Sequence, residues 1–226
     1  MPTQDKIRAI EQAIAQAVAH SSNLTPDALS VPGFTSPNIR HLMNNLGALS
    51  TRYLEIGVHK GGSFCSTIYG NPNLSHVTAI DHWIDLYGGK DYDLPTFKEF
   101  MCHAADHVDP GTNLSITRSP LFDVNPGKIV GPIDLYYYDA DHSQQYQCDQ
   151  IPYFLPCLDQ EFVMCVDDFS WDQVRMGTIQ GLGKANLHIV KDWEFTVSKP
   201  GQHWEQMAGE PWWNGFYVAL LRKQDG

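Results

Sequence analysis

Two groups of acidic residues in the sequence have the spacing needed to bind a cation or to assist a proton transfer. The run Y-Y-Y-D-A-D-H ends in Asp139, Asp141 and His142, and the run V-M-C-V is followed by Asp167 and Asp168. Apolar, aromatic and β-branched runs of this kind are typical of buried parallel strands. Because open α/β sheets bind ligands at the carboxyl ends of their strands, we expect Asp139, Asp167 and Asp168 to converge on one cleft. Three carboxylates there repel one another unless a cation lies between them.

His142 has the chemistry of a general base. It lies three residues after Asp139, near enough to act on a substrate bound at the same site. Histidine titrates near neutral pH, which suits removal of a proton from a hydroxyl group. The alternative is a surface histidine at the start of a helix, and we expect Asp141 to cap that helix. Asp167 and Asp168 also have a capping alternative, although two adjacent carboxylates are more than a cap requires.

A glycine-containing turn, E-I-G-V-H-K-G-G-S, occupies residues 55–63 between a predicted strand and a predicted helix. Gly57 permits a sharp turn, whereas Gly61 and Gly62 allow backbone amides to approach a ligand closely. The positive end of the helix behind them favours a carboxylate or a phosphate. The alternative is a tight strand–helix turn without a ligand. An acidic residue stands where the dinucleotide fingerprint has its first glycine, which disfavours an NAD-dependent enzyme.

Asp81 ends the next predicted strand, in the run A-I-D-H-W. An acidic residue at this point can accept hydrogen bonds from both hydroxyls of a ribose. Trp83 has an aromatic ring that can stack on an adenine or gate a substrate. Taken alone, Asp81 is as often a helix cap as a ligand. In combination with the glycine turn, a nucleoside-binding site is the favoured interpretation.

Strand and helix patterns alternate around these candidate residues. Strands are predicted at residues 52–56, 76–80, 114–117, 133–138, 162–166, 187–197 and 216–222. Helices are predicted at residues 3–20, 38–49, 63–69, 94–107, 147–155 and 171–181, with a connecting segment at 23–37. This alternation predicts a parallel sheet wrapped by helices, and the last two strands predict an antiparallel hairpin. We expect the loop of that hairpin, with Trp204, Trp212 and Trp213, and residues 82–100 to cover the substrate.

Length and charge exclude several classes of protein. A chain of 226 residues suffices for one well-cored domain. A formal net charge of −11 and a pI near 5.2 disfavour nucleic acid as a partner. The five cysteines are odd in number and form no C-x-x-C pair, which predicts free thiols in a reducing cytoplasm. We expect neither a signal peptide nor a membrane span, because no apolar run is long enough.

In their order, the motifs resemble those of class I S-adenosylmethionine (SAM)-dependent methyltransferases. The series is E-x-G-x-x-x-G-G-S, a strand-end aspartate, D-A-D-H-S and D-D, over residues 52–222. It is most similar to small-molecule O-methyltransferases of the macrocin type and to the metal-dependent catechol-like group. The resemblance implies a Rossmann-like α/β sandwich with a mostly parallel seven-stranded sheet in the order 3-2-1-4-5-7-6. It also implies an antiparallel C-terminal strand and helices on both faces of the sheet. Residues 51–226 would then form the methyltransferase domain, and residues 1–50 an N-terminal helical extension.

The resemblance also implies roles for individual residues. The cofactor would contact a set of residues drawn from all the motifs: Glu55, Gly57, Gly61, Gly62 and Ser63 at its methionine end, Asp81 at its ribose, Ser119 and Trp83 beside its adenine end, and Asp139. Mg²⁺ would be held by Asp139, Asp167 and Asp168. His142 matches the position of a lysine base in the catechol-like group, so Asp139 and His142 become the catalytic candidates. At the position of Asp168, that group usually has Asn.

The expected activity is transfer of a methyl group from SAM to a hydroxyl of a small molecule such as a sugar or a phenol, with Mg²⁺ as a second cofactor. Two alternatives remain open. The first is a metal-independent methyltransferase, in which the carboxylates only order the cleft and His142 works alone as the base. A non-catalytic cofactor-binding module is the other. The amphipathic first helix either covers its own core or pairs with a second subunit, so a homo-oligomer is also left open.

Overall fold

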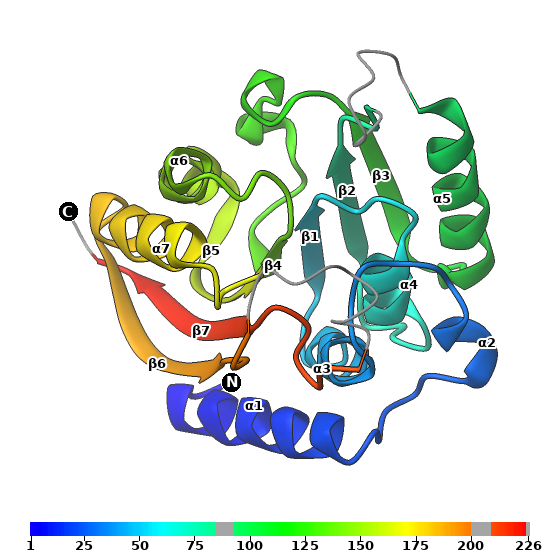
Figure 1. Ribbon diagram of the computed structural model, residues 1–226, viewed down its shortest axis with the longest axis horizontal. Coiled ribbons are helices and arrows are strands. Elements are labelled where there is room, and N and C mark those ends of the chain that lie inside the picture. Colours follow the sequence, from blue (N-terminus) through cyan, green and yellow to red (C-terminus); the bar gives the residue numbers. More distant parts are fainter. Residues whose placement is uncertain (85–92, 200–208, 225–226) are drawn as a thin grey trace.

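A mixed sheet of seven strands forms the centre of the protein (Figure 1). The computed structural model describes residues 1–84, 93–199 and 209–224. The order across the sheet is β3-β2-β1-β4-β5-β7-β6. The strands are β1 (Arg52–Ile56), β2 (His76–Asp81), β3 (Asn113–Arg118), β4 (Ile133–Tyr138), β5 (Leu158–Asp167), β6 (Leu187–Phe195) and β7 (Phe216–Lys223). The order implied by the resemblance is therefore confirmed.

Strands β1 to β5 are parallel, and β7 runs antiparallel to both β5 and β6. The register aligns the carboxyl ends of the central strands at one edge. Ile56 of β1 lies beside Ile80 of β2 and Tyr138 of β4, and Tyr138 lies beside Val166 of β5. Asp81, Gly57, Asp139 and Asp167 immediately adjoin these positions, so the register alone brings the predicted motifs to the same edge.

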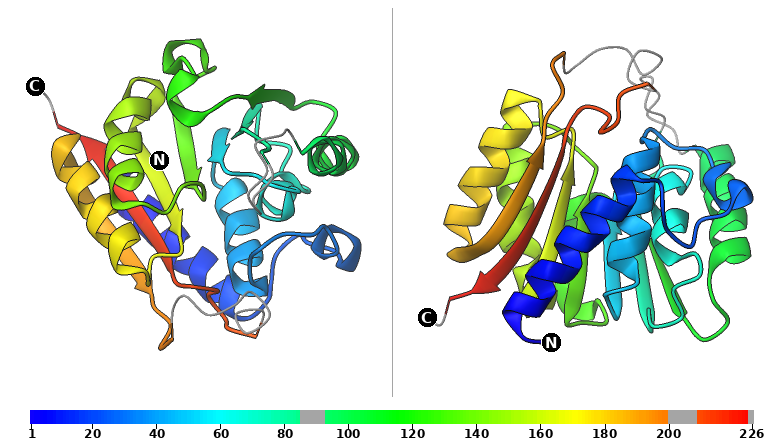
Figure 2. Two further views of the ribbon diagram at one scale, coloured as in Figure 1. Left: turned by 45° about the horizontal axis from the view of Figure 1, so that its top comes forward. Right: turned by 90° about the horizontal axis from the view of Figure 1, so that it is seen from below.

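Helices cover both faces of the sheet (Figure 2). The α-helices are α1 (Thr3–Val18), α2 (Pro26–Leu29), α3 (Pro37–Gly47), α4 (Gly62–Ile68), α5 (Leu94–His107), α6 (Gln144–Phe154) and α7 (Asp172–Lys184), and short 3₁₀ turns lie at Leu121–Asp123, Pro126–Lys128 and Leu155–Cys157. Helices α1, α3, α4 and α5 contribute to one hydrophobic core, whereas α6 and α7 contribute to the other. Among the described residues, none of the helices combines the length and the apolar character needed to cross a membrane.

The three tyrosines of β4 show how the strands divide between the two cores. Tyr137 belongs to the core under α3 and α4, and Tyr136 and Tyr138 belong to the core under α6 and α7. All three are fully buried. Successive side chains of a strand point to opposite faces of the sheet, so an uninterrupted aromatic run identifies a strand covered on both sides. The predicted parallel sheet with buried strands is confirmed.

Two local expectations were wrong. The connecting segment contains helix α2, which begins at Pro26 and is capped by the side chain of Thr25, an acceptor for the N–H of Ala28. Ser143, rather than Asp141, is the N-cap of α6; Asp141 instead accepts a hydrogen bond from the N–H of Ser143. In both cases a short polar side chain satisfies free amide groups at a helix start. Residues 85–92 of the predicted cover, and Trp204, lie outside the described residues.

Candidate active site

A cavity of about 590 Å³ opens at the carboxyl edge of the sheet. Its volume is in the range of sites that hold cofactors and small substrates. Most of the predicted site residues line it, and they come from five different strand ends: Gly57, Gly62 and Ser63 after β1, Asp81 and Trp83 after β2, Ser119 after β3, Asp139 and His142 after β4, and Asp168 after β5. Glu55, Gly61 and Asp167 are not part of the lining.

The turn after β1 passes directly beside the end of β4. Gly57 has a φ of +88°, and a Cβ at this position would lie 1.7 Å from the carbonyl oxygen of Asp139. Gly61 also has a positive φ, +96°, and precedes the first residue of α4. Both positions therefore need glycine for backbone reasons, since other L-residues rarely adopt this conformation. The turn brings β1, β4 and α4 together at the floor of the cavity.

Glu55 lies beneath the cavity rather than in its wall. It is fully buried, and its carboxylate accepts hydrogen bonds from the hydroxyls of Tyr53 and Ser63. Burial raises the pKa of Glu55 to about 8, although these two hydrogen bonds oppose the increase. Because Ser63 lines the cavity, Glu55 fixes the orientation of a hydroxyl that a ligand can reach. The structure thus places Glu55 behind the predicted methionine end of the cofactor.

Asp81 is held rigidly at the end of β2. Its two carboxylate oxygens accept hydrogen bonds from the backbone N–H groups of His59 (2.9 Å) and Trp83 (2.8 Å). The backbone N–H of Ser119 donates to the carbonyl oxygen of Asp81 at 3.0 Å, which fixes the end of β3 next to it. Each carboxylate oxygen retains a lone pair, because it can accept more than one hydrogen bond. Asp81 can therefore still bind the hydroxyls of a ribose.

Trp83 is packed more tightly than a stacking platform requires. It is only 2% exposed, and its ring lies against Phe97 and Phe100, with centroid distances of 4.8 and 5.2 Å. Its Nε1–H donates to the carbonyl oxygen of His59 at 2.9 Å. These contacts give Trp83 a structural role in joining the turns after β1 and β2. Its contact with an adenine stays a prediction.

The segment before α3 forms a wall of the cavity that the sequence patterns did not indicate. Gly33, Phe34 and Thr35 line it. Phe34 stacks on His59 with a centroid distance of 5.0 Å, and a Cβ on Gly62 would lie 2.8 Å from the Cα of Gly33. The run P-G-F-T-S-P at residues 32–37 could have indicated this wall, because turn residues of this kind also occur where a chain passes close to another backbone.

Arg40 of α3 holds this wall in position. It is 7% exposed, and its guanidinium donates hydrogen bonds to the backbone carbonyls of Ala28, Leu29 and Val31 and to the hydroxyl of Ser66. Burial lowers the pKa of Arg40 to about 10. The wall is therefore anchored to α3 and α4. Residues before position 51 thus contribute both to the core of the protein and to its cavity.

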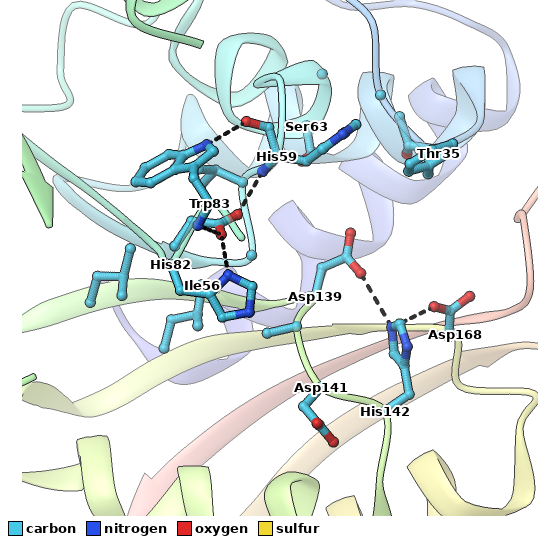
Figure 3. A pocket seen from close by; sticks show the side chains of 18 of the residues that line it. Thr35, Ile56, His59, Ser63, His82, Trp83, Asp139, Asp141, His142 and Asp168 are labelled. Carbon is cyan, nitrogen blue, oxygen red and sulfur yellow. Dashed lines mark hydrogen bonds and ion pairs between the residues drawn. The ribbon is translucent and has the colours of Figure 1, made fainter. Parts of the chain in front are cut away.

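Asp139, His142 and Asp168 form a close cluster (Figure 3). Nε2 of His142 lies 2.8 Å from Oδ2 of Asp168 and 3.8 Å from Oδ1 of Asp139. One ligand atom from each of the three residues lies within 4.8 Å of the other two. Asp168 has a φ of +55°, and its other carboxylate oxygen, Oδ1, is buried without a hydrogen-bond partner among the described residues. This set of atoms can hold a cation.

The cluster differs from the predicted metal ligands by one residue. His142 belongs to it, whereas Asp167 lies outside. Oδ2 of Asp167 accepts a hydrogen bond from the hydroxyl of Tyr137 (2.9 Å), and its Oδ1 accepts one from the backbone N–H of Asp168 (2.9 Å). Asp167 is still in β5, so its side chain points to the face occupied by Tyr137. Asp168 follows the strand, and its left-handed backbone conformation turns its carboxylate toward His142.

The charges of the cluster are strongly coupled. Burial raises the pKa of Asp139 to about 6; His142 opposes this increase and Asp168 adds to it. Burial alone lowers the pKa of His142, but the carboxylates of Asp139 and Asp168 outweigh it and raise the pKa to about 10. Without another cation, His142 is therefore protonated at neutral pH and offsets one of the two carboxylate charges. Burial and the charges of Asp139 and Asp168 also raise the pKa of Asp167 well above its usual range.

This coupling predicts the titration of His142 in metal-free protein. We expect its ¹⁵N chemical shifts to report an imidazolium well above pH 6.5, with a midpoint near pH 10. Because the folded pKa exceeds the unfolded value, the stabilisation is complete below pH 6.5 and is lost as the pH rises through 10. Replacement of Asp168 by Asn should lower the midpoint. A midpoint near 6.5 in the unmodified protein would show that the ion pairs do not form.

The sheet order and the cavity at its carboxyl edge define the class I methyltransferase fold. The sequence matches the family model described as methyltransferase domain over residues 54–169, just over half of the chain. The chain therefore belongs to the methyltransferase-domain family, and the protein is a transferase enzyme of that family. No curated protein matches the sequence.

Three solved structures share this fold at low sequence identity. The O-methyltransferase TomG from Streptomyces achromogenes, involved in tomaymycin synthesis and solved with SAM, is 17% identical with a TM-score of 0.56, over 95% of this chain and 89% of that one. An O-methyltransferase from Bacillus cereus solved with S-adenosylhomocysteine (SAH) is 13% identical with a TM-score of 0.54, over 98% and 93%. Cofactor-bound Rv0187 from MTB is 20% identical with a TM-score of 0.56, over 94% and 91%. At these identities the likeness concerns the fold.

Proposed function

We propose that the protein is a SAM-dependent O-methyltransferase that methylates a hydroxyl of a small molecule with the help of a divalent cation. The observation that carries this proposal is the shared cavity. One side holds the glycine turn, Asp81 and Ser119, which suit a nucleoside cofactor, and the other holds the cluster of Asp139, His142 and Asp168. A methyl donor and a deprotonating site within the same cavity are what transfer to a hydroxyl requires.

The proposed reaction is an in-line displacement. SAM, when bound, supplies the methyl group on a cationic sulfonium; the bond from acceptor oxygen to methyl carbon forms as the carbon–sulfur bond breaks, leaving SAH. Asp81 and the glycine turn orient the donor, and the wall at residues 33–35 limits access of water. The hydroxyl proton passes to Nε2 of His142, which needs to be neutral to accept it. A cation held by Asp139 and Asp168 would lower the pKa of His142, because it would offset the negative charges that raise this pKa.

The cluster fits a divalent cation by its donor atoms. Carboxylate oxygens suit Mg²⁺ and Mn²⁺, and Oδ1 of Asp168 is buried without a partner among the described residues. We propose that Asp139 and Asp168 hold the cation, and that Asp167 supports Asp168 through the hydrogen bond to its backbone N–H. A cation there would supply Lewis acidity that favours loss of the hydroxyl proton. The residues before position 51 are proposed as part of the methyltransferase unit, because they form a cavity wall.

Chelation tests the metal requirement directly. We expect EDTA to abolish methyl transfer, measured as release of SAH, and Mg²⁺ or Mn²⁺ in excess to restore it. Full activity in chelator would support the metal-independent alternative, in which the carboxylates only order the cleft and His142 works alone. The specific observation behind that alternative is the 2.8 Å contact between His142 and Asp168.

Binding of SAH tests the cofactor side without any acceptor. Replacement of Asp81 by alanine should weaken SAH binding by about 100-fold, since it removes two hydrogen bonds to a charged group. Isothermal titration calorimetry measures this change, with His76→Ala at the opposite end of β2 as the control. Equal affinities of the Asp81 variant and the unmodified protein would contradict the proposed ribose contact.

A further inference from the structure

The acceptor side of the cavity has aromatic walls. Trp171 and Trp213 line it together with the carboxylate cluster. The ring of Trp171 meets His142 edge to face, with a centroid distance of 4.9 Å and an angle of 74°, and Trp213 is 6% exposed. Aromatic side chains offer apolar area to a ring-shaped ligand, while neighbouring polar groups fix its orientation.

Apart from histidines, the charged side chains among the described lining residues are all acidic. No lysine or arginine is among the described residues that line the cavity, whereas five aspartates are: Asp81, Asp93, Asp139, Asp141 and Asp168. Lys60 and Arg175, which lie close in sequence to lining residues, are engaged elsewhere. Lys60 pairs with Glu99 at 2.8 Å, and Arg175 pairs with Glu194 at 2.8 Å. Neither of these two side chains lines the cavity.

Asp168 shows which kind of group this side of the cavity can accept. It is 6% exposed, and its Oδ1 has no hydrogen-bond partner within the described part of the chain. A buried carboxylate oxygen in this state is stabilised by a hydrogen-bond donor or a cation and destabilised by another acceptor. Hydroxyl and ammonium groups are donors, whereas carboxylate and phosphate groups are only acceptors at neutral pH.

We propose that the methyl acceptor is a hydroxylated ring without any anionic group, and that acceptors bearing an amine bind more tightly than neutral ones. This inference rests on the proposed function, because it assigns the second substrate of the same cavity. One divalent cation and the singly cationic cofactor do not cancel the five carboxylate charges. An anionic acceptor therefore enters a field that repels it, and like-charge contacts of this kind weaken binding strongly.

Probes that share a ring and differ in one substituent, which is neutral, anionic or cationic, test the inference. One set is 4-methylcatechol, 3,4-dihydroxybenzoate and dopamine; the other is glucose, glucuronate and glucosamine. Binding of each to protein loaded with SAH and Mg²⁺ is measured by ligand-observed NMR, and methylation by SAH release in separate samples with SAM. In each set that binds, we expect the carboxylate member to bind at least about tenfold more weakly than the neutral one, and the amine member about threefold more tightly.

A variant that removes one negative charge tests whether the cavity wall causes the preference for neutral over carboxylate probes. Asp141 lines the cavity, and its Oδ1 accepts the N–H of Ser143 at 2.8 Å. Asp109 makes the same local contact with the N–H of Gly111 at 2.9 Å and is not among the residues that line the cavity. Asp141→Asn should reduce the ratio of the Kd of the carboxylate probe to the Kd of the neutral probe by about threefold. Asp109→Asn is the matched control and should leave this ratio of Kd values unchanged.

The outcomes separate the inference from the proposed function. A carboxylate probe that binds as tightly as its neutral partner overturns the inference, as does a failure of both sets to bind protein that takes up SAH. An equal effect of Asp141→Asn and Asp109→Asn also overturns it. Absence of SAH binding contradicts the proposed function itself, and the inference then falls with it.

Discussion

Methyl transfer by an Asp168→Ala variant is expected to fall by about 1,000-fold in kcat/KM, with little change in SAH affinity. Asp168 is the closest partner of His142, at 2.8 Å, and a member of the group of atoms that can hold a cation. Its loss would remove both a proposed ligand of the cation and the group that positions the base. A misplaced or missing acid–base group costs about 10²–10⁴-fold in rate. Release of SAH measures the rate, and calorimetry measures SAH affinity.

Two further variants separate a chemical effect from a structural one. Asp159→Ala, at the opposite end of the same strand, is the control and should retain full activity. Asp168→Asn keeps a carbonyl oxygen at the site and should keep activity within about tenfold, because that oxygen can still bind a cation. Asp167 is a poorer probe, since its removal leaves Tyr137 without its hydrogen-bond acceptor in the core. A loss below tenfold in Asp168→Ala would refute a catalytic role for this carboxylate.

Replacement of Gly57 by alanine is expected to lower the free energy of unfolding by about 4 kcal/mol or more, or to prevent folding. The new Cβ would lie 1.7 Å from the carbonyl oxygen of Asp139 and 2.4 Å from its carbonyl carbon. Both are backbone atoms of the adjacent strand end, so no side-chain rotation relieves the overlap. The φ of +88° adds a second cost for any residue with a Cβ.

Urea unfolding followed by circular dichroism measures this change in stability. Gly183→Ala in α7 is the control, because a Cβ there meets no atom within 4 Å. Alanine is the better helix former, so we expect this control to be as stable as the unmodified protein or more stable by up to about 1 kcal/mol. Similar destabilisation by both substitutions would rule out the close approach of Gly57 to Asp139.

The strand ends that form the site follow from periodicity. Asp81 and Asp139 follow directly on short runs at residues 76–80 and 133–138, whose β-branched and aromatic residues favour buried strands. The parallel register of these strands then aligns their carboxyl ends. Contacts between distant segments have no such signal. The approach of Gly33 to Gly62 joins a loop to the first residue of α4, and neither sequence indicates the other. It requires the position of α3, which is set by packing rather than by local propensity.

The pair Asp167–Asp168 illustrates a different limit. Both residues follow the same apolar run, and the sequence predicts equal access to the cleft. Alternation in a strand sends consecutive side chains to opposite faces, so only one of two adjacent residues can face the cavity while the strand continues. The strand continues to Asp167 and ends there. Because the strand ends at this residue, Asp167 accepts a hydrogen bond from Tyr137 and Asp168 contacts His142. The residue at which a strand ends is difficult to predict from a sequence.

The φ of +55° at Asp168 restricts which amino acids can evolve at this position. Among residues with a side chain, Asn and Asp tolerate the left-handed region best. Exchange between these two changes the local charge by one unit and leaves the backbone as it is. The shape of the turn therefore permits the substitution that would most directly alter the affinity of the cluster for the proposed cation. Position 168 is thus a point where selection can adjust electrostatics without rebuilding the fold.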